Sequence, residues 1–154
     1  MVETTGEMWA LYKEPNYVLC ITTNGTVKSN GECVMGSGCA LEAKTRFPGI
    51  ARALGTSIKA RGNVVCGYLG EFISDINAYK LLFFPVKYNW DESANLNLIR
   101  RSALKLKEFA EGWPEKTFIL PRPGCGNGGL RWEDVKPLLL DLPDNVQVIS
   151  REGP

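Results

Sequence analysis

Histidine is missing from all 154 residues of the sequence. Its absence excludes Ser-His-Asp triads and Cys-His pairs as catalytic devices, and it removes the commonest ligand of zinc. No C-x-x-C pair occurs either, because the five cysteines are Cys20, Cys33, Cys39, Cys66 and Cys125. We therefore expect no metal site, and nothing indicates a cofactor. An odd number of cysteines in a chain without a recognisable signal peptide is typical of reduced thiols in a cytoplasmic protein.

Long apolar runs and a strong net charge are also lacking. No run approaches the roughly 20 apolar residues that span a membrane, so no membrane partner is expected. With 18 basic and 17 acidic residues the net charge is +1, which disfavours a protein that holds nucleic acid mainly by neutralising phosphates. Hydrophobic residues make up 44% of the chain, enough for a buried core. We expect one domain over residues 1–154, and a monomer.

Strand-like and helix-like patterns alternate along the chain. Apolar and β-branched runs predict strands at residues 8–13, 17–23, 64–69, 80–86, 116–121 and 146–150. Amphipathic spacing predicts helices at residues 39–47, 48–60, 94–111 and 132–141. Asp91 or Ser93 could cap the third helix, and Gly62 suits a left-handed cap after the second. This alternation predicts a three-layer α/β domain.

Two glycine-rich loops carry the functional hypothesis. Residues 24–38 leave a strand and end where a helix begins, so backbone N–H groups and the helix dipole favour an anion there. Residues 121–130 repeat this logic after another apolar strand. Ligands of open α/β sheets bind outside the carboxyl ends of the strands. The two loops could grip the two halves of a diphosphate; alternatively, their glycines only form turns.

The second loop also matches G-x-G-x-x-G through Gly124, Gly126 and Gly129. A dinucleotide-binding unit needs a following βαβ segment with an acidic residue about 20 positions on. Only about 25 residues follow Gly129, too few for that unit. A P-loop of the form G-x-x-x-x-G-K-[ST] is absent as well. The Rossmann and P-loop interpretations are therefore both disfavoured.

Four segments together resemble the macro domain family. They are ITTNG at 21–25, VMGSGCALEAKTRFP at 34–48, FPVKYNW at 84–90 and PRPGCGNGGLRWEDV at 121–135. They look closest to the branch of DNA ADP-ribosyl glycohydrolase antitoxins and phage-encoded macro domains, and order and spacing match over roughly residues 6–150. The resemblance implies an α/β/α sandwich with a mixed central sheet and a cleft for ADP-ribose across the strand ends.

The resemblance also implies roles for single residues. Glu7 matches a position that contacts adenine, and Asn24 matches an asparagine that faces the distal ribose. Lys87 falls where the glycohydrolase branch has a catalytic lysine. Some relatives carry an aspartate where this chain has Gly128, which argues against a two-residue Lys/Asp mechanism. The glycohydrolase antitoxins have a similar GNGGL loop, so a lysine-centred mechanism stays open. The loops matching the diphosphate sites are Val34, Met35, Gly36, Ser37 and Gly38 in the first, and Gly124, Cys125, Gly126, Asn127, Gly128 and Gly129 in the second.

Several functions stay open at this stage. The leading hypothesis is an ADP-ribosyl hydrolase acting on modified DNA or protein, in which Lys87 assists the leaving oxygen or attacks the opened sugar as an amine. A non-catalytic reader or sponge of ADP-ribose, an ADP-ribose 1''-phosphate phosphatase, and an unrelated nucleotide binder are alternatives. Tyr88 and Trp90 could stack on a base or ribose, or could line a turn. Trp132, Cys39 and Cys125 are interpreted as packing residues.

Overall fold

The computed structural model describes residues 1–68 and 79–151, and within them the chain forms a mixed sheet of six strands. The strand order is β1-β6-β5-β2-β4-β3, and all neighbours run parallel except β3 and β4. The bounds are β1 Val2–Thr5, β2 Tyr17–Thr23, β3 Cys66–Tyr68, β4 Leu81–Pro85, β5 Thr117–Pro121 and β6 Val146–Ser150. The parallel strands place the carboxyl ends of β2, β4, β5 and β6 at one edge of the sheet.

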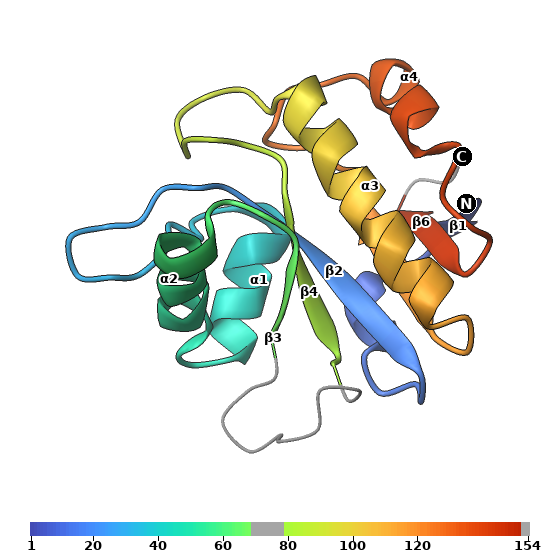
Figure 1. The fold of residues 1–154 in the computed structure, drawn as a ribbon, viewed down its shortest axis with the longest axis horizontal. Helices are drawn as coiled ribbons and strands as arrows, with labels where there is room; N and C mark the ends of the chain where they lie inside the picture. The colour runs from blue at the N-terminus through green and yellow to red at the C-terminus, as the bar shows by residue number, and fades with distance from the viewer. Residues whose placement is uncertain (69–78, 152–154) are drawn as a thin grey trace.

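Helices cover both faces of this sheet. Figure 1 shows α1 and α2 on one side and α3 and α4 on the other. The bounds are α1 Gly38–Arg46, α2 Ile50–Arg61, α3 Leu96–Gly112 and α4 Trp132–Val135, with 3-10 helices η1 Met8–Leu11 and η3 Lys136–Leu139. The predicted three-layer architecture is therefore confirmed. No helix in the described part of the chain is both long and apolar enough to cross a membrane.

The core consists of two apolar layers, one on each face of the sheet. Successive residues of β2 alternate between them: Val18 and Cys20 pack on the α3 side, and Leu19 and Ile21 pack on the α1 and α2 side. All five residues of β4 are buried, with Leu82 and Phe84 in the layer on the α3 side and Leu81 and Phe83 in the other layer. A strand covered on both faces has no solvent-facing positions, which explains the continuous apolar runs.

The amino-terminal segment differs from its prediction. Residues 8–13 were expected to form a strand, but Met8–Leu11 is a 3-10 helix whose Met8 and Trp9 side chains are buried. The first strand instead comes earlier, at β1, and adds to the edge of the sheet by pairing with β6. A short apolar run fits a strand or a buried helical turn equally well, so local pattern could not separate the two.

Helix and strand ends also required correction. α3 is capped by Asn95, whose Oδ1 accepts from the Leu98 N–H at 3.0 Å, and not by Asp91 or Ser93. The helix predicted from residue 48 begins at Ile50, because Gly49 has φ 91°. Gly62 does follow α2 with positive φ, but its ψ of −177° is extended. The helix predicted at 132–141 is α4 followed by η3. The strand predicted at 64–69 is β3, and its residue 69 lies outside the described residues.

Candidate functional site

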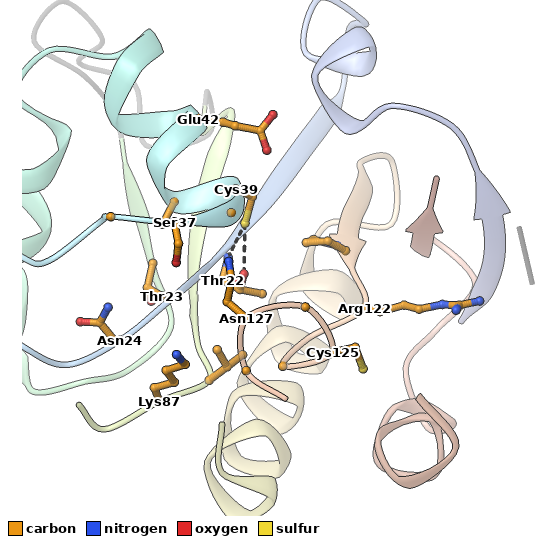
Figure 2. A pocket seen from close by; sticks show the side chains of 18 of the residues that line it. Thr22, Thr23, Asn24, Ser37, Cys39, Glu42, Lys87, Arg122, Cys125 and Asn127 are labelled. Carbon is orange, nitrogen blue, oxygen red and sulfur yellow. Dashed lines mark hydrogen bonds between the residues drawn. The ribbon is translucent and has the colours of Figure 1, made fainter. Parts of the chain in front are cut away.

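A cavity of about 940 Å³ opens at the carboxyl edge of the sheet. Its wall includes the ends of three strands, at Thr23 of β2, Pro121 of β5 and Ser150 of β6, and residues directly after β4. Residues of both glycine-rich loops also line it, so segments about 90 positions apart in the chain share one cavity. Figure 2 shows this region from close by.

The outer half of the first loop is anchored on α2. Val27 and Cys33 form an isolated antiparallel bridge, and the Cys33 N–H donates to the Ala51 carbonyl at 2.9 Å. A Cβ on Gly55 would lie 2.0 Å from the Gly31 carbonyl oxygen, so only glycine permits this approach. The anchored half directs residues 34–38 back toward the cavity.

The end of the first loop leads into α1 at the cavity wall. Ser37 is the N-cap residue, and Gly38 has φ 57°. The Cys39 sulfur contacts the Thr22 hydroxyl at 3.0 Å and accepts from the Thr22 N–H at 3.3 Å, which ties the start of α1 to the end of β2 (Figure 2). Burial raises the pKa of the Cys39 thiol, so this sulfur is not an ionised nucleophile at neutral pH.

The second loop folds back on itself beside α3. The Leu130 N–H donates to the Gly124 carbonyl at 2.9 Å, and the Ala94 N–H donates to the Gly128 carbonyl at 2.9 Å. A Cβ on Gly128 would lie 2.5 Å from the Gly124 oxygen, whereas a Cβ on Gly126 would meet nothing within 4 Å. Packing therefore holds the base of the loop, and its tip remains open to the cavity.

The tips of the two loops face each other. A Cβ on Gly38 would lie 3.4 Å from the Asn127 side-chain nitrogen. Within residues 1–68 and 79–151, the N–H groups of 36–38 and of 126–128 have no protein acceptor. Two sets of N–H donors, one of them at the start of a nine-residue helix, therefore converge on one space. Such an arrangement suits the oxygens of a diphosphate.

Asn24 holds the first loop as well as lining the cavity. Its Nδ2 donates to the Val34 carbonyl at 2.9 Å, and its Oδ1 accepts from the Thr26 N–H at 3.0 Å. The Asn24 Oδ1 also accepts from the Cys33 thiol at 3.7 Å, so the second N–H of the amide group is left to reach a ligand.

Lys87 lies in the cavity wall immediately after β4. Its Nζ donates to the Trp90 carbonyl at 3.3 Å, and its backbone carbonyl accepts from Asn63 Nδ2 at 3.0 Å. Its own N–H donates to the Thr23 carbonyl at 3.3 Å. Contacts from β2 and from the turn after α2 thus fix the backbone from which this amine extends. Figure 2 shows the Lys87 side chain among the residues that line the cavity.

Two buried polar atoms of the cavity wall lack a hydrogen-bond partner. Among the described residues the unpartnered buried side-chain atoms are Thr4 Oγ1, Trp9 Nε1 and Thr23 Oγ1, and Thr23 and Trp9 line the cavity. Thr23 is only 4% exposed. Leaving a buried hydroxyl or indole N–H unpaired costs stability, so such groups are expected where a ligand supplies the missing partner.

Comparison with known proteins identifies the family to which the chain belongs. No family model matches the chain. The DNA ADP-ribosyl glycohydrolase of Mycobacterium tuberculosis is 33% identical over 124 residues, which are 75% of this chain and 34% of that protein. The chain thus spans about a third of the length of the curated relatives it matches. The solved macrodomain of Mycobacterium tuberculosis DarG superposes with a TM-score of 0.72 and 27% identity over 96% of both chains. The chain belongs to the macro domain family.

A second solved structure agrees with this fold. The Thermosipho africanus DarTG structure in complex with ADP-ribose has a TM-score of 0.73 and 24% identity, covering 100% of this macro domain and 43% of that chain. The predicted α/β/α sandwich with a mixed sheet and the predicted family are therefore confirmed. Within the described part of this macro domain, no three His, Cys, Asp or Glu side chains are placed to hold a metal ion.

Most residues predicted for the site line the cavity of this macro domain. They are Asn24, Val34, Gly36, Ser37, Gly38, Lys87, Gly124, Cys125, Gly126, Asn127 and Gly128. Met35 is 2% exposed and packs in the core below the first loop. The Gly129 N–H closes the second loop onto the Gly126 carbonyl at 3.1 Å. Both support the loops from outside the cavity.

Glu7 and Tyr88 are not brought to the cavity wall. The Glu7 carboxylate pairs with Arg151 Nε at 3.0 Å, and it is Arg151 that lines the cavity. Tyr88 is exposed, and its hydroxyl accepts from Arg101 at 3.5 Å. At an exposed turn or near a chain end, tertiary contacts decide where a side chain points. The position of a residue in a sequence motif does not reveal those contacts.

Sequence reasoning also missed several lining residues. These residues are Thr22, Thr23, Lys28, Arg122 and Arg151. Lys28 and Arg122 lie within the two glycine-rich loops, but no role was predicted for them. The signal available for Thr22 and Thr23 was their position at the carboxyl end of an apolar strand. Arg151 follows the last strand in the same manner. Trp90, which was considered together with Tyr88, lines the cavity.

Proposed function

We propose that this macro domain binds ADP-ribose and removes it from modified DNA. The observation that carries the proposal is the convergence of unpaired N–H groups from the two loops next to Lys87 in one cavity. The unpartnered Thr23 hydroxyl supports it, because a bound sugar or phosphate offers hydrogen-bonding oxygens. The names of relatives such as the Mycobacterium tuberculosis DNA ADP-ribosyl glycohydrolase favour DNA as the modified target.

The cavity residues divide the chemistry between them. The diphosphate would be held by the backbone N–H groups of residues 36–38 and 126–128. Asn24 would orient the distal ribose with its free amide N–H. Hydrolysis breaks the bond between C1 of that ribose and the target, and water supplies the new C1 oxygen. The target atom leaves with the bonding electron pair and gains a proton. Lys87 would support that departure as a cation or proton donor, or would attack the opened sugar as an amine.

Lys87→Ala tests the catalytic part of the proposal. We expect turnover of an ADP-ribosylated DNA oligonucleotide to fall about 100-fold or more, because an acid or nucleophile is lost. Affinity for free ADP-ribose, measured by calorimetry, should change only a few-fold because the loops remain. Lys59→Ala, at an exposed position on α2, is the matched control. Equal turnover in wild type and Lys87→Ala would contradict the role of Lys87.

A non-catalytic reader of ADP-ribose is the second candidate, and Gly128 favours it. A side chain there would collide with the Gly124 carbonyl, so the second loop has no place for the aspartate that some relatives carry. A reader binds ADP-ribose tightly but releases none from modified DNA or modified protein. Assays on both substrates, together with phosphate release from ADP-ribose 1''-phosphate, separate reader, hydrolase and phosphatase.

We further propose that residues 1–154 act as one domain and as a monomer in a cytoplasm-like compartment. The five free cysteines suit a reducing environment. Light scattering coupled to gel filtration tests the monomer, with an apparent mass near 17.0 kDa as the expected result.

A further inference from the structure

The cavity has two chemically different ends. Because the strand order is β6-β5-β2-β4, residues after β6 and after β4 lie on opposite sides of the two loops. Ser150 and Arg151 line the β6 end, whereas Lys87 and Trp90 line the β4 end. If the proposed function holds and Lys87 stands at the bond to be broken, the modified target must extend from the β4 end.

The most exposed aromatic side chain at the β4 end of the cavity is Trp90. It is 57% exposed, and it is the only exposed tryptophan of the four in the chain. Its backbone is held firmly, since its N–H donates to Thr26 Oγ1 at 3.0 Å and its carbonyl accepts from Lys87 Nζ at 3.3 Å. A fixed backbone therefore presents a large aromatic ring to solvent beside the amine. An exposed tryptophan ring offers a flat apolar face and a polar N–H edge to a molecule bound at the cavity rim.

Exposed aromatic and charged side chains surround Trp90. Tyr88 is exposed next to it and has its hydroxyl against Arg101 of α3, and Lys28 lines the cavity from the first loop. Two exposed acidic residues, Asp91 and Glu92, directly follow Trp90, and the Glu92 carboxylate accepts from Asn89 Nδ2 at 2.8 Å. Exposed aromatic rings interleaved with cations are the combination that binds single-stranded nucleic acid, in which rings stack on bases and cations meet phosphates.

We propose that Trp90 is a stacking platform for a nucleobase at or beside the modified nucleotide. A base offers its face to a protein ring only when it is not stacked inside a duplex. Tyr88, Arg101 and Lys28 extend the platform along the strand. This inference rests on the proposed hydrolase function and adds which residue selects the target.

The test compares Trp90→Ala and Trp90→Phe with Leu140→Ala, a control at a similarly exposed apolar residue, 59% exposed and outside the cavity. Three quantities are measured for each: the Kd of free ADP-ribose, kcat/KM on an ADP-ribosylated single-stranded oligonucleotide, and kcat/KM on an ADP-ribosylated protein. Loss of stacking on one base should lower kcat/KM on the oligonucleotide about fivefold or more in Trp90→Ala. Trp90→Phe should retain most of it, and the other two quantities should be unchanged.

The opposite outcomes are distinct. Equal oligonucleotide turnover in wild type and Trp90→Ala, with normal thermal unfolding, overturns the platform but leaves the hydrolase intact. A parallel loss on DNA, protein and free ADP-ribose also overturns it, because the ring would then form part of the ADP-ribose seat. A wild-type chain that cleaves neither substrate defeats the proposed function itself.

If the wild type cleaves neither substrate, a binding measurement still tests whether Trp90 stacks on a base. Titration with an unmodified single-stranded oligonucleotide should quench the tryptophan emission of the wild type, and Trp90→Phe should abolish the quenching. The same sequence as a duplex should quench much less. Absence of quenching by the single strand, or equal quenching in Trp90→Phe, overturns the proposal.

Discussion

Adjacent residues at the end of β2 make opposite use of their polar groups. The Asn24 side-chain amide forms hydrogen bonds within the first loop, to the Val34 carbonyl and from the Thr26 N–H. Thr23, one position earlier, keeps a buried hydroxyl with no partner in the described chain. The first residue therefore stabilises the loop. The second carries a buried hydroxyl without a protein partner, with which we expect a molecule bound in the cavity to form a hydrogen bond.

Thr23→Val tests this interpretation, because valine removes the hydroxyl and keeps the shape. The unfolding free energy without ligand should stay the same or rise by about 1 kcal/mol, since an unsatisfied buried group disappears. Affinity for ADP-ribose should fall about three- to tenfold through loss of one hydrogen bond. Urea unfolding and calorimetry measure the two effects.

Thr4→Val is the matched control. The Thr4 hydroxyl is likewise buried and unpartnered, but Thr4 does not line the cavity. It should show the same stability effect and an unchanged affinity. An unchanged affinity in Thr23→Val too would mean that the Thr23 hydroxyl does not touch the ligand.

At the scale of elements, each loop combines glycines that are packed with a glycine that is open. Gly128 and Gly124 are enclosed by the start of α3 and by each other, whereas Gly126 has free space where a Cβ would lie. In the first loop, Gly36 is open in the same sense. Packed glycines set the course of each loop, and open ones let a ligand approach the backbone closely.

Gly128→Ala should therefore act on the structure of the second loop. The new methyl group would lie 2.5 Å from the Gly124 oxygen and 2.8 Å from the Ala94 Cβ. We expect a loss of about 1–3 kcal/mol in unfolding free energy and weaker ADP-ribose binding, because the loop must move. Gly112→Ala, at the end of α3 with nothing within 4 Å, should not destabilise the fold. The thermal unfolding midpoints of both variants test this prediction. Equal midpoints for Gly128→Ala and Gly112→Ala would contradict the packing argument.

At the scale of the whole molecule, the edge strand β1 is joined to the second loop by charge. The Glu3 carboxylate accepts from Lys136 Nζ at 2.8 Å and from Trp132 Nε1 at 3.1 Å, and Arg122 lies 3.8 Å away. The hydrogen bond from Lys136, followed by that from Trp132 and the two positive charges, outweighs desolvation and holds the pKa of Glu3 below its usual value. Because Arg122 lines the cavity, this cluster connects the rim of the site to the amino-terminal strand.

The Glu3 cluster predicts an acid-dependent loss of stability. Since the folded state lowers the pKa of Glu3, its contribution is complete above the unfolded pKa of about 4.3 and is lost as the pH falls through the lower folded pKa. Glu3→Gln should therefore be less stable than wild type at pH 6, and the difference should shrink below about pH 4.3. Urea unfolding of both proteins between pH 3 and pH 6 measures it. A difference that stays constant over this range would contradict the assigned cause.

Much of the fold was predictable from the sequence because buried parallel strands and amphipathic helices have local patterns. The predicted bounds agree with the observed ones to within one residue at each end for β2, β4, β5 and β6. β1 was missed because VETT is a short, polar edge strand, and η1 was mistaken for a strand because its burial comes from contacts beyond its own pattern.

The site was predictable to the extent that it is made of backbone. Glycine spacing marked both loops, and their shared edge followed from strand polarity. The placement of Glu7 away from the cavity, behind Arg151, and of Trp90 rather than Tyr88 in the wall depended on side-chain directions at exposed positions. Such directions are set by neighbours that lie far away in the chain.

The sequence by itself determined the layered α/β architecture and the two N–H-rich loops, because apolar periodicity and glycine positions are local properties. The candidate lysine followed from the resemblance to a known family. Only the tertiary structure decided that Gly38 and Asn127 meet, that Thr23 is left without a partner, and that Trp90 stands at the exit beside Lys87. Those features arise where separate strands end side by side, and no stretch of the chain alone contains them.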